Sequence, residues 1–452
     1  MTLPYYSTPD GKVTLYAGHV IDVLREMPAE SVNCVVTSPP YWSLRKYDCE
    51  PVIWGGESGC EHEWETGLIS GEGNSGSRRW QHGSTSGVEH LQRELRASGE
   101  LAPLNVSHAT CHLCGAWYGD LGLEPTPELY VEHTLMWMRE VKRVLRKDGT
   151  LWLNIGDGYA GGSVIRGDGQ WPKQHDSTLP RTAYGRVGAL KPKDAVLMPF
   201  RVALAAQADG WWVRSVIIWA KPNPMPESVR DRPTDAHEYV FLLTKSKTYF
   251  YDAEAVKEAG SPNTHRRAPV GQVSRPPSES PEGIAERGRL GVFTDGRQYD
   301  YEPGDSRNLR SVWSFPTQGF PDAHFAVFPR ELPERCIKAG CPEWVCPKCG
   351  KARVRVTENT PMKIRRTDWG ELAGNRTATS GTMVAPAEST TTGWTDCGCG
   401  EPFVGGVTLD PFAGSGTTCE VAYHLGRTAI GIDASAKYLD MAIGRVKQGA
   451  LL

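Results

Sequence analysis

The stretch that most constrains the fold lies near the C-terminus, where residues 407–435 read VTLDPFAGSGTTCEVAYHLGRTAIGIDAS. An apolar strand ends at Asp410, a glycine-rich loop follows, and a helix that begins near Thr417 leads to a second strand, which ends at Asp433. Gly414 and Gly416 permit a tight turn and let a ligand approach the backbone closely. This order predicts a βαβ unit, and hence an α/β protein with a parallel sheet.

The glycine-rich loop departs from two phosphate-binding patterns. Cys419 occupies the third glycine position of the dinucleotide fingerprint G-x-G-x-x-G, and the loop lacks the lysine of a P-loop. Asp433 follows the loop by about 20 residues, where an acid hydrogen-bonds ribose hydroxyls. A nucleoside cofactor without a pyrophosphate fits this pattern, and S-adenosylmethionine is the common one. A strand-to-helix turn without a ligand is the alternative.

The rest of the chain repeats the alternation of strands and helices. Segments 31–38, 150–157, 211–223 and 237–246 predict strands, whereas 126–149, with a capping-box-like Thr126, and 194–210 predict helices. A chain of 452 residues with 39% hydrophobic side chains can form one large core with insertions. We predict core segments at 1–46, 116–258, 306–345 and 402–452, with insertions at 47–115, 259–305 and 346–401. The middle insertion lacks periodicity and predicts a variable or partly disordered loop.

A second motif lies at the end of an early strand, where residues 35–42 read VVTSPPYW. Pro39 and Pro40 cannot continue a sheet, so their carbonyls form a rigid row of acceptors at the strand end. The Ser38 hydroxyl can donate and accept, and Tyr41 and Trp42 offer flat ring faces. Such a corner could grip a planar group that carries an amine. A turn with two packed rings is the alternative.

Together, TSPPYW and DPFAGSGTT resemble the amino-methyltransferases of DNA in the circularly ordered beta group, where the catalytic motif precedes the cofactor motif. The segments EVKRVLRKDGTLWLNIGDGYA, WAKPNPMPESVRDRPTDAHEYVFLLTKS and HFAVFPRELPERCI are similar to recurring segments of that family, so the resemblance extends over most of the chain. It implies a Rossmann-like, S-adenosylmethionine-dependent core and a site-specific DNA methyltransferase that flips its target base out of the duplex.

The resemblance also assigns roles to individual residues. The catalytic corner consists of Ser38, Pro39, Pro40 and Tyr41. The implied cofactor-binding residues are Asp410, Phe412, Gly414, Gly416 and Thr417 in the loop, Asp433 at the ribose, and Phe325 and Pro329 in the segment that closes over the methionine end. One departure is His19, which stands where relatives place an aspartate that contacts the cofactor's adenine amine. Asp22 has the wrong spacing to replace that aspartate.

In the implied reaction, Tyr41 stacks on the flipped base, while the Ser38 hydroxyl and the Pro39 carbonyl accept hydrogen bonds from the base's amine. Relatives with serine before the two prolines usually act on N4 of cytosine, and relatives with Asp or Asn there on N6 of adenine. Ser38 therefore predicts cytosine N4, with adenine N6 as the alternative. Cys34 lies inside the strand and is assigned to the core, because methylation of a ring carbon would need a cysteine in the corner.

Two groups of cysteines have the spacing of metal sites. CPKC at 346–349 with CGC at 397–399 predicts a zinc ribbon, with Cys341 as a substitute ligand. CEH at 60–62 with CHLC at 111–114 predicts a second site, where His112 competes for a ligand position. The predicted ligands of the two structural zinc ions are Cys346, Cys349, Cys397 and Cys399, and Cys60, His62, Cys111 and Cys114. Unliganded cysteines are the alternative.

Composition limits the partners and the compartment. Since the formal net charge is −3, DNA binding requires local basic runs, such as residues 77–80, 265–267 and 363–366. No stretch has the apolar length of a signal peptide or a membrane span, so we expect a cytoplasmic protein in which twelve cysteines favour metal sites over disulfides. The expected partner is double-stranded DNA, with a homodimer and a cognate restriction endonuclease left open. The competing functions are a zinc-ribbon DNA-binding protein on a decayed methyltransferase scaffold, and a methyltransferase acting on RNA or a free nucleotide.

Overall fold

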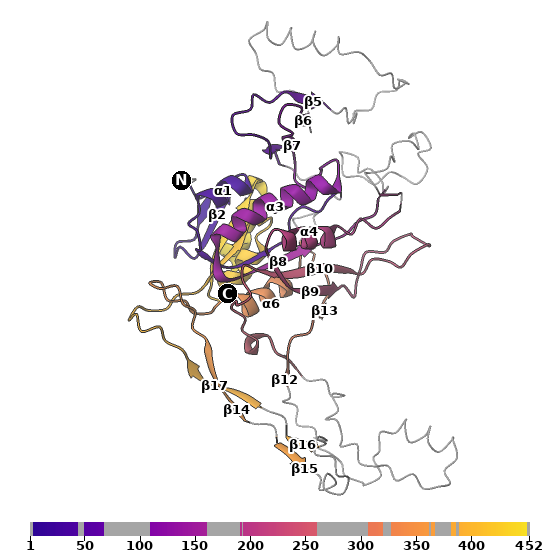
Figure 1. Ribbon diagram of the computed structural model, residues 1–452. Helices are drawn as coiled ribbons and strands as arrows, with labels where there is room; N and C mark the ends of the chain where they lie inside the picture. Colours follow the sequence, from indigo (N-terminus) through magenta and orange to yellow (C-terminus); the bar gives the residue numbers. More distant parts are fainter. Residues whose placement is uncertain are drawn as a thin grey trace, which may run out of the picture. The chain divides into compact units, whose positions relative to one another are not determined.

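The computed structural model describes residues 3–43, 49–66, 109–160, 190–191, 193–259, 306–319, 327–360, 363–366, 381–385 and 388–449 (Figure 1). Internal contacts divide the chain into two compact units. The first unit consists of Met1–Tyr251, Ser311–Glu343 and Gly405–Leu452, and the second of Asp252–Arg310 and Trp344–Val404.

The first unit is built on a nine-stranded sheet with the order β1-β2-β19-β18-β3-β8-β10-β9-β13. Its strands are β1 (Tyr6–Ser7), β2 (Val13–Ala17), β3 (Val32–Thr37), β8 (Leu145–Ile155), β9 (Trp212–Ala220), β10 (His237–Thr244), β13 (Val312–Ser314), β18 (Val407–Asp410) and β19 (Thr428–Asp433). Neighbours from β2 to β8 run parallel, which confirms the predicted class. β10 is antiparallel to both β8 and β9. The described connection from β9 to β10 contains no helix to provide the crossover that a parallel pair needs.

Helices cover both faces of this sheet. α1 (Val20–Glu26), α3 (Pro127–Val144) and α4 (Met198–Ala208) pack on one another, and α7 (Thr417–His424) packs on α6 (Glu331–Gly340) and α8 (Ala436–Gly449). β8 contacts both α3 and α6, and β19 contacts both α1 and α7, so the sheet lies between the two groups. Among the described residues, no helix has both the length and the apolar character needed to cross a membrane.

The helix predicted at 126–149 is shorter than expected. Its start is confirmed, because the Thr126 side chain accepts a hydrogen bond from the N–H of Leu129. Its end was placed too late: α3 stops at Val144, and β8 begins at Leu145, which pairs with Val32 of β3. Lys142 and Arg143 lie in the last turn of α3, but Arg146 and Lys147, which we also read as part of the helix end, belong to β8, where Leu145 is fully buried in the core.

The inserted segments contain short strands. In the first unit, β4 (Val52–Trp54), β5 (Trp64–Thr66), β6 (Ala109–Cys111) and β7 (Trp117–Gly119) form an antiparallel sheet with the order β4-β7-β6-β5. The second unit holds three two-stranded sheets, in which β11 (Glu258–Ala259) pairs with β12 (Ser306–Arg307), β14 (Arg355–Thr360) with β17 (Glu388–Trp394), and β15 (Lys363–Arg366) with β16 (Gly381–Ala385). A short 3-10 helix, Glu254–Val256, precedes β11.

The sheet order brings the two sequence motifs together. β18 continues through α7 to β19, whereas β3 continues through α3 to β8, so the chain leaves two adjacent strands in opposite directions. Ligands of open α/β sheets bind at such a switch point, beyond the carboxyl ends of the strands. At this point the Thr37 hydroxyl donates to Asp410 Oδ1 over 2.7 Å, which joins the end of β3 to the end of β18.

Candidate active site

The catalytic corner is held in place by the backbone and by α3. It follows β3 directly, and the carbonyl of Pro40 accepts a hydrogen bond of 2.8 Å from the Tyr130 hydroxyl. The N–H of Ser43 donates to the carbonyl of Gly122 over 2.7 Å. Gly122 has a φ of +96°, and a Cβ there would lie 3.0 Å from the carbonyl oxygen of Tyr41. Two segments therefore approach each other so closely that this turn needs glycine.

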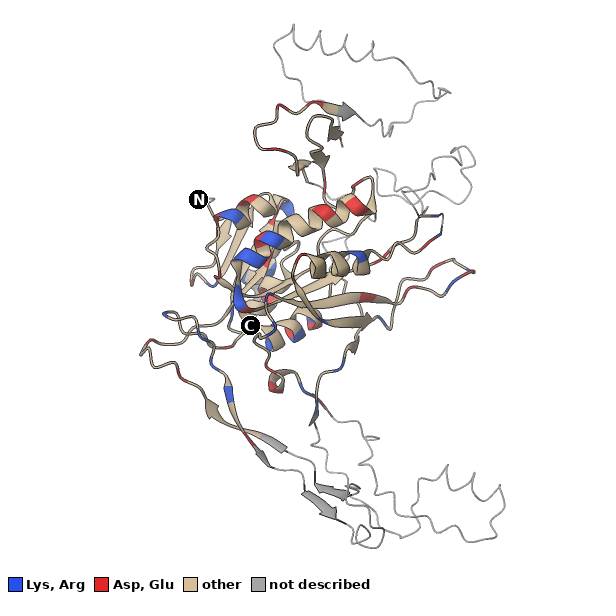
Figure 2. Cartoon of the chain, in the orientation of Figure 1, with Lys and Arg blue, Asp and Glu red and all other residues tan. Residues whose placement is uncertain are grey.

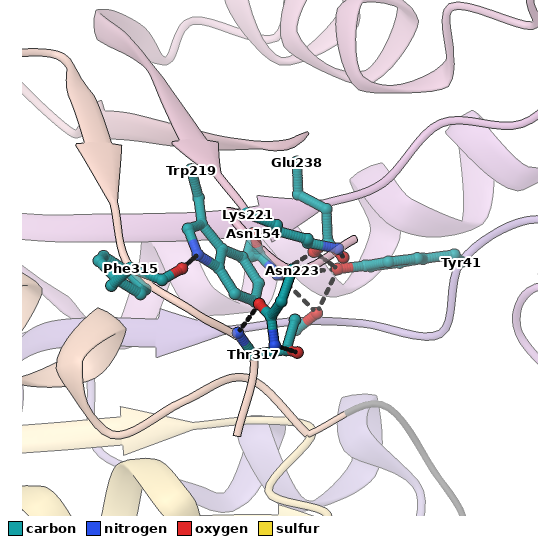
Figure 3. Close-up of polar contacts among 9 residues, drawn as sticks. Tyr41, Asn154, Trp219, Lys221, Asn223, Glu238, Phe315 and Thr317 are labelled. Atoms are coloured by element: carbon teal, nitrogen blue, oxygen red, sulfur yellow. Dashed lines mark hydrogen bonds and ion pairs between the residues drawn. The ribbon is translucent and has the colours of Figure 1, made fainter. Parts of the chain in front are cut away.

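A polar network surrounds the Tyr41 hydroxyl (Figure 3). Ser38 Oγ donates to the Tyr41 oxygen over 3.0 Å, and the Tyr41 hydroxyl donates to Glu238 Oε2 over 2.7 Å. Asn154 Nδ2 lies 2.8 Å from both the Tyr41 oxygen and Glu238 Oε2. Lys221 forms an ion pair with Glu238 Oε1. The network gives Ser38 a continuous path of hydrogen bonds to a charged carboxylate.

Three members of this network were not predicted as site residues. Asn154 lies near the end of β8, Glu238 near the start of β10, and Lys221 follows β9 directly, so neighbouring strands bring them together. The segments that contain them are similar to recurring family segments, but sequence alone did not show which side chains face the corner. The ring of Tyr41 packs on Gly156, where a Cβ would lie 2.7 Å from Tyr41 Cε2.

A second set of contacts fixes the chain beyond β13 (Figure 3). Trp219 Nε1 donates to the carbonyl of Phe315 over 2.9 Å, and the two rings stack at 5.5 Å. Asn223 and Thr317 exchange two hydrogen bonds of 3.0 and 3.1 Å. Of the two residues expected to close over the cofactor, Phe325 lies outside the described residues. Pro329 is buried and its carbonyl accepts a hydrogen bond from the N–H of Leu332, at the start of α6.

The predicted cofactor loop is organised by two acids. Asp433 accepts hydrogen bonds of 2.8 Å from the N–H groups of Gly414 and Ser435, one on each carboxylate oxygen. Asp410 Oδ1 accepts from the N–H of Phe412 over 3.1 Å, in addition to the bond from Thr37. Burial raises the pKa of Asp410 to about 6 and also raises the pKa of Asp433. Both acids therefore shape the loop itself.

The glycines and the threonine of the loop have distinct surroundings. Gly414 and Gly416 have φ values of +51° and +78°, and a Cβ on Gly416 would lie 2.5 Å from Cβ of Ala442 on α8. The Thr417 hydroxyl accepts a hydrogen bond from Arg445, so its side chain serves the contact with α8. The Ser415 hydroxyl is buried, and no protein group among the described residues bonds to it.

His19 lies beside the cofactor loop, because Gly18 donates its N–H to the carbonyl of Asp433. Its Nδ1 is 3.5 Å from Asp22 Oδ2, and its ring meets Trp54 edge-on at 4.7 Å. Burial lowers the pKa of the imidazole, and Nε2 is buried without a partner among the described residues. The Asp22 side chain is 70% exposed, whereas the His19 side chain is only 14% exposed.

In both predicted metal sites the four proposed ligand side chains lie close together. Within each group of four, Cys60, His62, Cys111 and Cys114, and Cys346, Cys349, Cys397 and Cys399, the ligand atoms lie within 4.8 Å of one another. The two competing ligands have other contacts: His112 bonds to Glu63, and the buried Cys341 accepts a hydrogen bond from Thr408 in the first unit. Cys34 is fully buried, as predicted for a core residue.

The described surface carries both charges. Figure 2 shows basic and acidic residues interspersed over the helices of the first unit, in line with the formal net charge of −3. Of the three basic runs, 77–80 and 265–267 lie outside the described residues, and Lys363–Arg366 is strand β15.

Comparison with known proteins identifies the family. A family model described as DNA methylase matches residues 32–345 and 398–444. Type II methyltransferase M.XycI of Xanthomonas campestris pv. cyanopsidis is 34% identical over 330 residues, which is 72% of each chain. M.Cfr9I of Citrobacter freundii is 29% identical over 438 residues, 96% of this chain and 87% of the relative. The solved PvuII DNA methyltransferase, cytosine-N4-specific, is 16% identical with a TM-score of 0.44, over 98% of this chain and 88% of that one. The resemblance seen in the motifs is confirmed: the chain belongs to the DNA methylase family, the amino-methyltransferases of DNA.

Proposed function

We propose that this DNA methylase transfers a methyl group from S-adenosylmethionine to the exocyclic N4 amine of cytosine, in a base flipped out of double-stranded DNA. The proposal depends on one observation: the Ser38 hydroxyl is connected to the carboxylate of Glu238 by hydrogen bonds through Tyr41. Ser38 donates to Tyr41, and Tyr41 donates to Glu238. Because the serine proton is used in this way, Ser38 Oγ is left as an acceptor, and we assign a lone pair not used by Asn154 Nδ2, 3.4 Å away, to the amine of the substrate.

This acceptor addresses the main chemical difficulty of the reaction. The lone pair of an exocyclic amine is delocalised into the ring, so the amine is a poor nucleophile. Hydrogen bonds from the amine to Ser38 Oγ and to the Pro39 carbonyl would localise that lone pair on nitrogen. Glu238 strengthens the Ser38 acceptor through Tyr41, since each bond in a chain polarises the next. The corner and the cofactor loop would then hold the amine nitrogen, the methyl carbon and the sulfur in line. This positioning provides a large part of the rate enhancement.

The cofactor loop fits S-adenosylmethionine, which supplies an electrophilic methyl group when bound. Each oxygen of Asp433 accepts one N–H and keeps a lone pair for a ribose hydroxyl. The buried Ser415 hydroxyl offers a further polar group to a ligand. We assign the backbone of Phe412 and the glycines to close approach of the cofactor, and Phe325 and Pro329 to its methionine end.

His19 is compatible with the adenine end of the cofactor. A neutral imidazole with its proton on Nδ1, facing Asp22, leaves Nε2 as an acceptor. The adenine amine needs an acceptor there, which relatives supply with a carboxylate. We therefore assign His19 Nε2 to this contact, in place of the missing aspartate.

The relatives' Type II names support a site-specific enzyme of a restriction-modification system. A cognate endonuclease and a homodimer remain proposals on this basis. We propose that the core consists of residues 1–46, 116–258, 306–345 and 402–452, with insertions between them. The insertion at 346–401, in the second unit, is the candidate for DNA recognition through its metal cluster and strand β15.

The test is nucleoside analysis by mass spectrometry of DNA from a host that lacks its own methyltransferases and expresses the protein. Sequencing that detects modified bases would give the site. We expect N4-methylcytosine, and we expect Ser38→Ala to lower single-turnover methylation by about tenfold to a hundredfold, at roughly 1.4 kcal/mol per decade. Ser31→Ala is the matched control, since Ser31 lies just before the other end of β3 and its hydroxyl donates to the carbonyl of Pro28. N6-methyladenine would move the proposal to adenine, and unmodified DNA would favour a decayed DNA-binding protein.

A further inference from the structure

The first metal cluster has the geometry of a closed tetrahedral site. Cys60 Sγ lies 4.0 Å from Cys111 Sγ, and Cys114 Sγ lies 3.3 Å from His62 Nδ1. Ligand atoms around a tetrahedral Zn²⁺ ion are about 3.5–3.8 Å apart, given Zn–S and Zn–N distances of about 2.3 and 2.0 Å. The set of three thiols and one imidazole is typical of structural zinc. We refer to these four residues as the metal knuckle.

The sheet around the knuckle is too small to be stable alone. Its four strands, β4 to β7, have three residues each, well below the usual strand length of about five or six. Cys111 ends β6, and the N–H of Gly115 donates to its carbonyl in a tight turn. Gly56 packs on this turn, where a Cβ would lie 2.9 Å from Cys114 Sγ. Small folds of this kind depend on a metal for their stability.

Two tryptophans connect this sheet to α3. Trp54 and Trp117 are paired across β4 and β7, and both rings stack on His133 of α3, at 5.5 and 5.4 Å. All three residues are at most 3% exposed. Movement of the small sheet would therefore disturb the packing of His133. We refer to Trp54 and Trp117 as the tryptophan pair.

His133 in turn is tied to the catalytic corner. Its Nδ1 lies 3.0 Å from Oε1 of the buried Glu124, whose Oε2 accepts the N–H of Gly122 over 2.8 Å. The carbonyl of Gly122 accepts the N–H of Ser43, and the carbonyl of Glu124 accepts Trp42 Nε1 over 2.9 Å. Both bonds hold the chain immediately after Tyr41.

We propose that a structural zinc ion in the metal knuckle positions the catalytic corner, through the tryptophan pair, His133 and Glu124. The catalytic role of the corner rests on the function proposed above. The chain of contacts from the metal knuckle to residues 41–43, which we call the link, does not depend on that function. Without the ion the tryptophan pair loosens, Glu124 loses its fixed partner, and the turn at Gly122 no longer holds residues 41–43. The knuckle residues act through others and touch no substrate, so they are positioning residues.

The experiment uses the full chain, metal-replete. Elemental analysis should give about two zinc ions per chain for the wild type and about one for Cys111→Ser. Amide hydrogen exchange then measures directly whether residues near the corner stay ordered, and this measurement does not require methyltransferase activity. We expect Cys111→Ser to speed exchange of the Ser43 and Gly122 amides at least tenfold. The Gly414 and Ser435 amides, which bond to Asp433 in the cofactor loop, should be unchanged, as should S-adenosylmethionine affinity.

Two further variants separate the metal from the link. Trp117→Leu should keep both metals but speed exchange at Ser43, and it should lower the single-turnover methylation rate. Cys397→Ser is the matched control, because it removes one zinc ion from the other cluster and should leave the Ser43 amide protected. Adding zinc back to metal-depleted wild type should restore both protection and rate.

The outcomes are decisive for the link. Normal Ser43 exchange in Cys111→Ser protein that has lost its metal would overturn the proposal, as would absence of zinc from the knuckle in the wild type. If Cys111→Ser fails to fold, normal Ser43 exchange in Trp117→Leu would overturn it instead. If the wild type methylates no DNA, the proposed function fails, while the exchange measurements still decide the link.

Discussion

Tyr41→Phe separates two roles for the aromatic residue of the catalytic corner. If Tyr41 only stacks on the flipped base, phenylalanine should serve as well, because its ring is the same size. In the structure, however, the hydroxyl accepts from Ser38 and Asn154 and donates to Glu238. The substitution removes this oxygen and leaves the ring against Gly156. We therefore expect a slower methyl transfer with unchanged cofactor binding.

The size of the effect follows from the bonds that are lost. A hydrogen bond to a charged group contributes about 1.5–3 kcal/mol, and only the part that strengthens in the transition state affects the rate. The bond to Glu238 is of this kind, and its loss also frees the Ser38 proton to point elsewhere. At about 1.4 kcal/mol per decade, the single-turnover rate should fall by roughly tenfold to a hundredfold.

The assay is transfer of a tritiated methyl group from S-adenosylmethionine to unmethylated DNA of mixed sequence, with enzyme in excess. Isothermal titration calorimetry gives the cofactor affinity of the same protein. Tyr5→Phe is the matched control, since its hydroxyl also bonds to a carboxylate, Asp440, over 2.8 Å, but on the exposed surface. A Tyr41→Phe rate within twofold of the wild type would refute the path from Ser38 to Glu238.

Two predictions concern the acids of the cofactor loop. Asp433→Ala should weaken S-adenosylmethionine binding by about 1.5–3 kcal/mol in calorimetry, because a charged acceptor for the ribose is lost; unchanged affinity would contradict that assignment. Burial raises the pKa of Asp410 to about 6, above its unfolded value of about 3.9. The Asp410 carboxyl group therefore stays protonated to a higher pH in the folded state than in the unfolded state. Its contribution to the free energy of unfolding is present below about pH 4 and is lost as the pH rises from about 4 to about 6. Asp410→Asn should remove that loss and raise the unfolding free energy at pH 7 by up to about 3 kcal/mol, measured by urea denaturation; an equal loss of stability in the variant between those pH values would contradict the argument.

The features that were predictable from sequence are those encoded locally. Prolines end β3 because they lack N–H groups, and glycines mark the loop after β18 because that loop needs positive φ values. The thiol spacings likewise encode short turns that bring ligands together. The position of the site at the switch point follows from the two motifs once a parallel sheet is assumed.

The features that were missed depend on side chains that meet across the sheet. Glu238 and Lys221 are separated by 17 residues, and Glu238 and Asn154 by 84, so no local pattern links them. The end of α3 was misplaced because basic residues before a glycine are typical of a helix end, while burial of Leu145 favours the strand. The contact of the Thr417 side chain with Arg445 could not be predicted either, because it depends on the packing of α8.

The hydrogen-bond network gives a physical reason for serine in the corner. Tyr41 has one proton, and the carboxylate of Glu238 can only accept, so that proton belongs to the bond with Glu238. The oxygen of Tyr41 is then left to accept, and its partner at position 38 must donate, as the Ser38 hydroxyl does. An ionised aspartate at position 38 could not donate, and it would bring a second negative charge toward Glu238. Asn154 Nδ2 also lies 3.4 Å from Ser38 Oγ, but it compensates only in part, because the same amide group already serves both Tyr41 and Glu238. The residue at position 38 and the carboxylate on β10 are therefore coupled, and an ionised aspartate at position 38 alone would remove the donor that Ser38 provides to the Tyr41 oxygen.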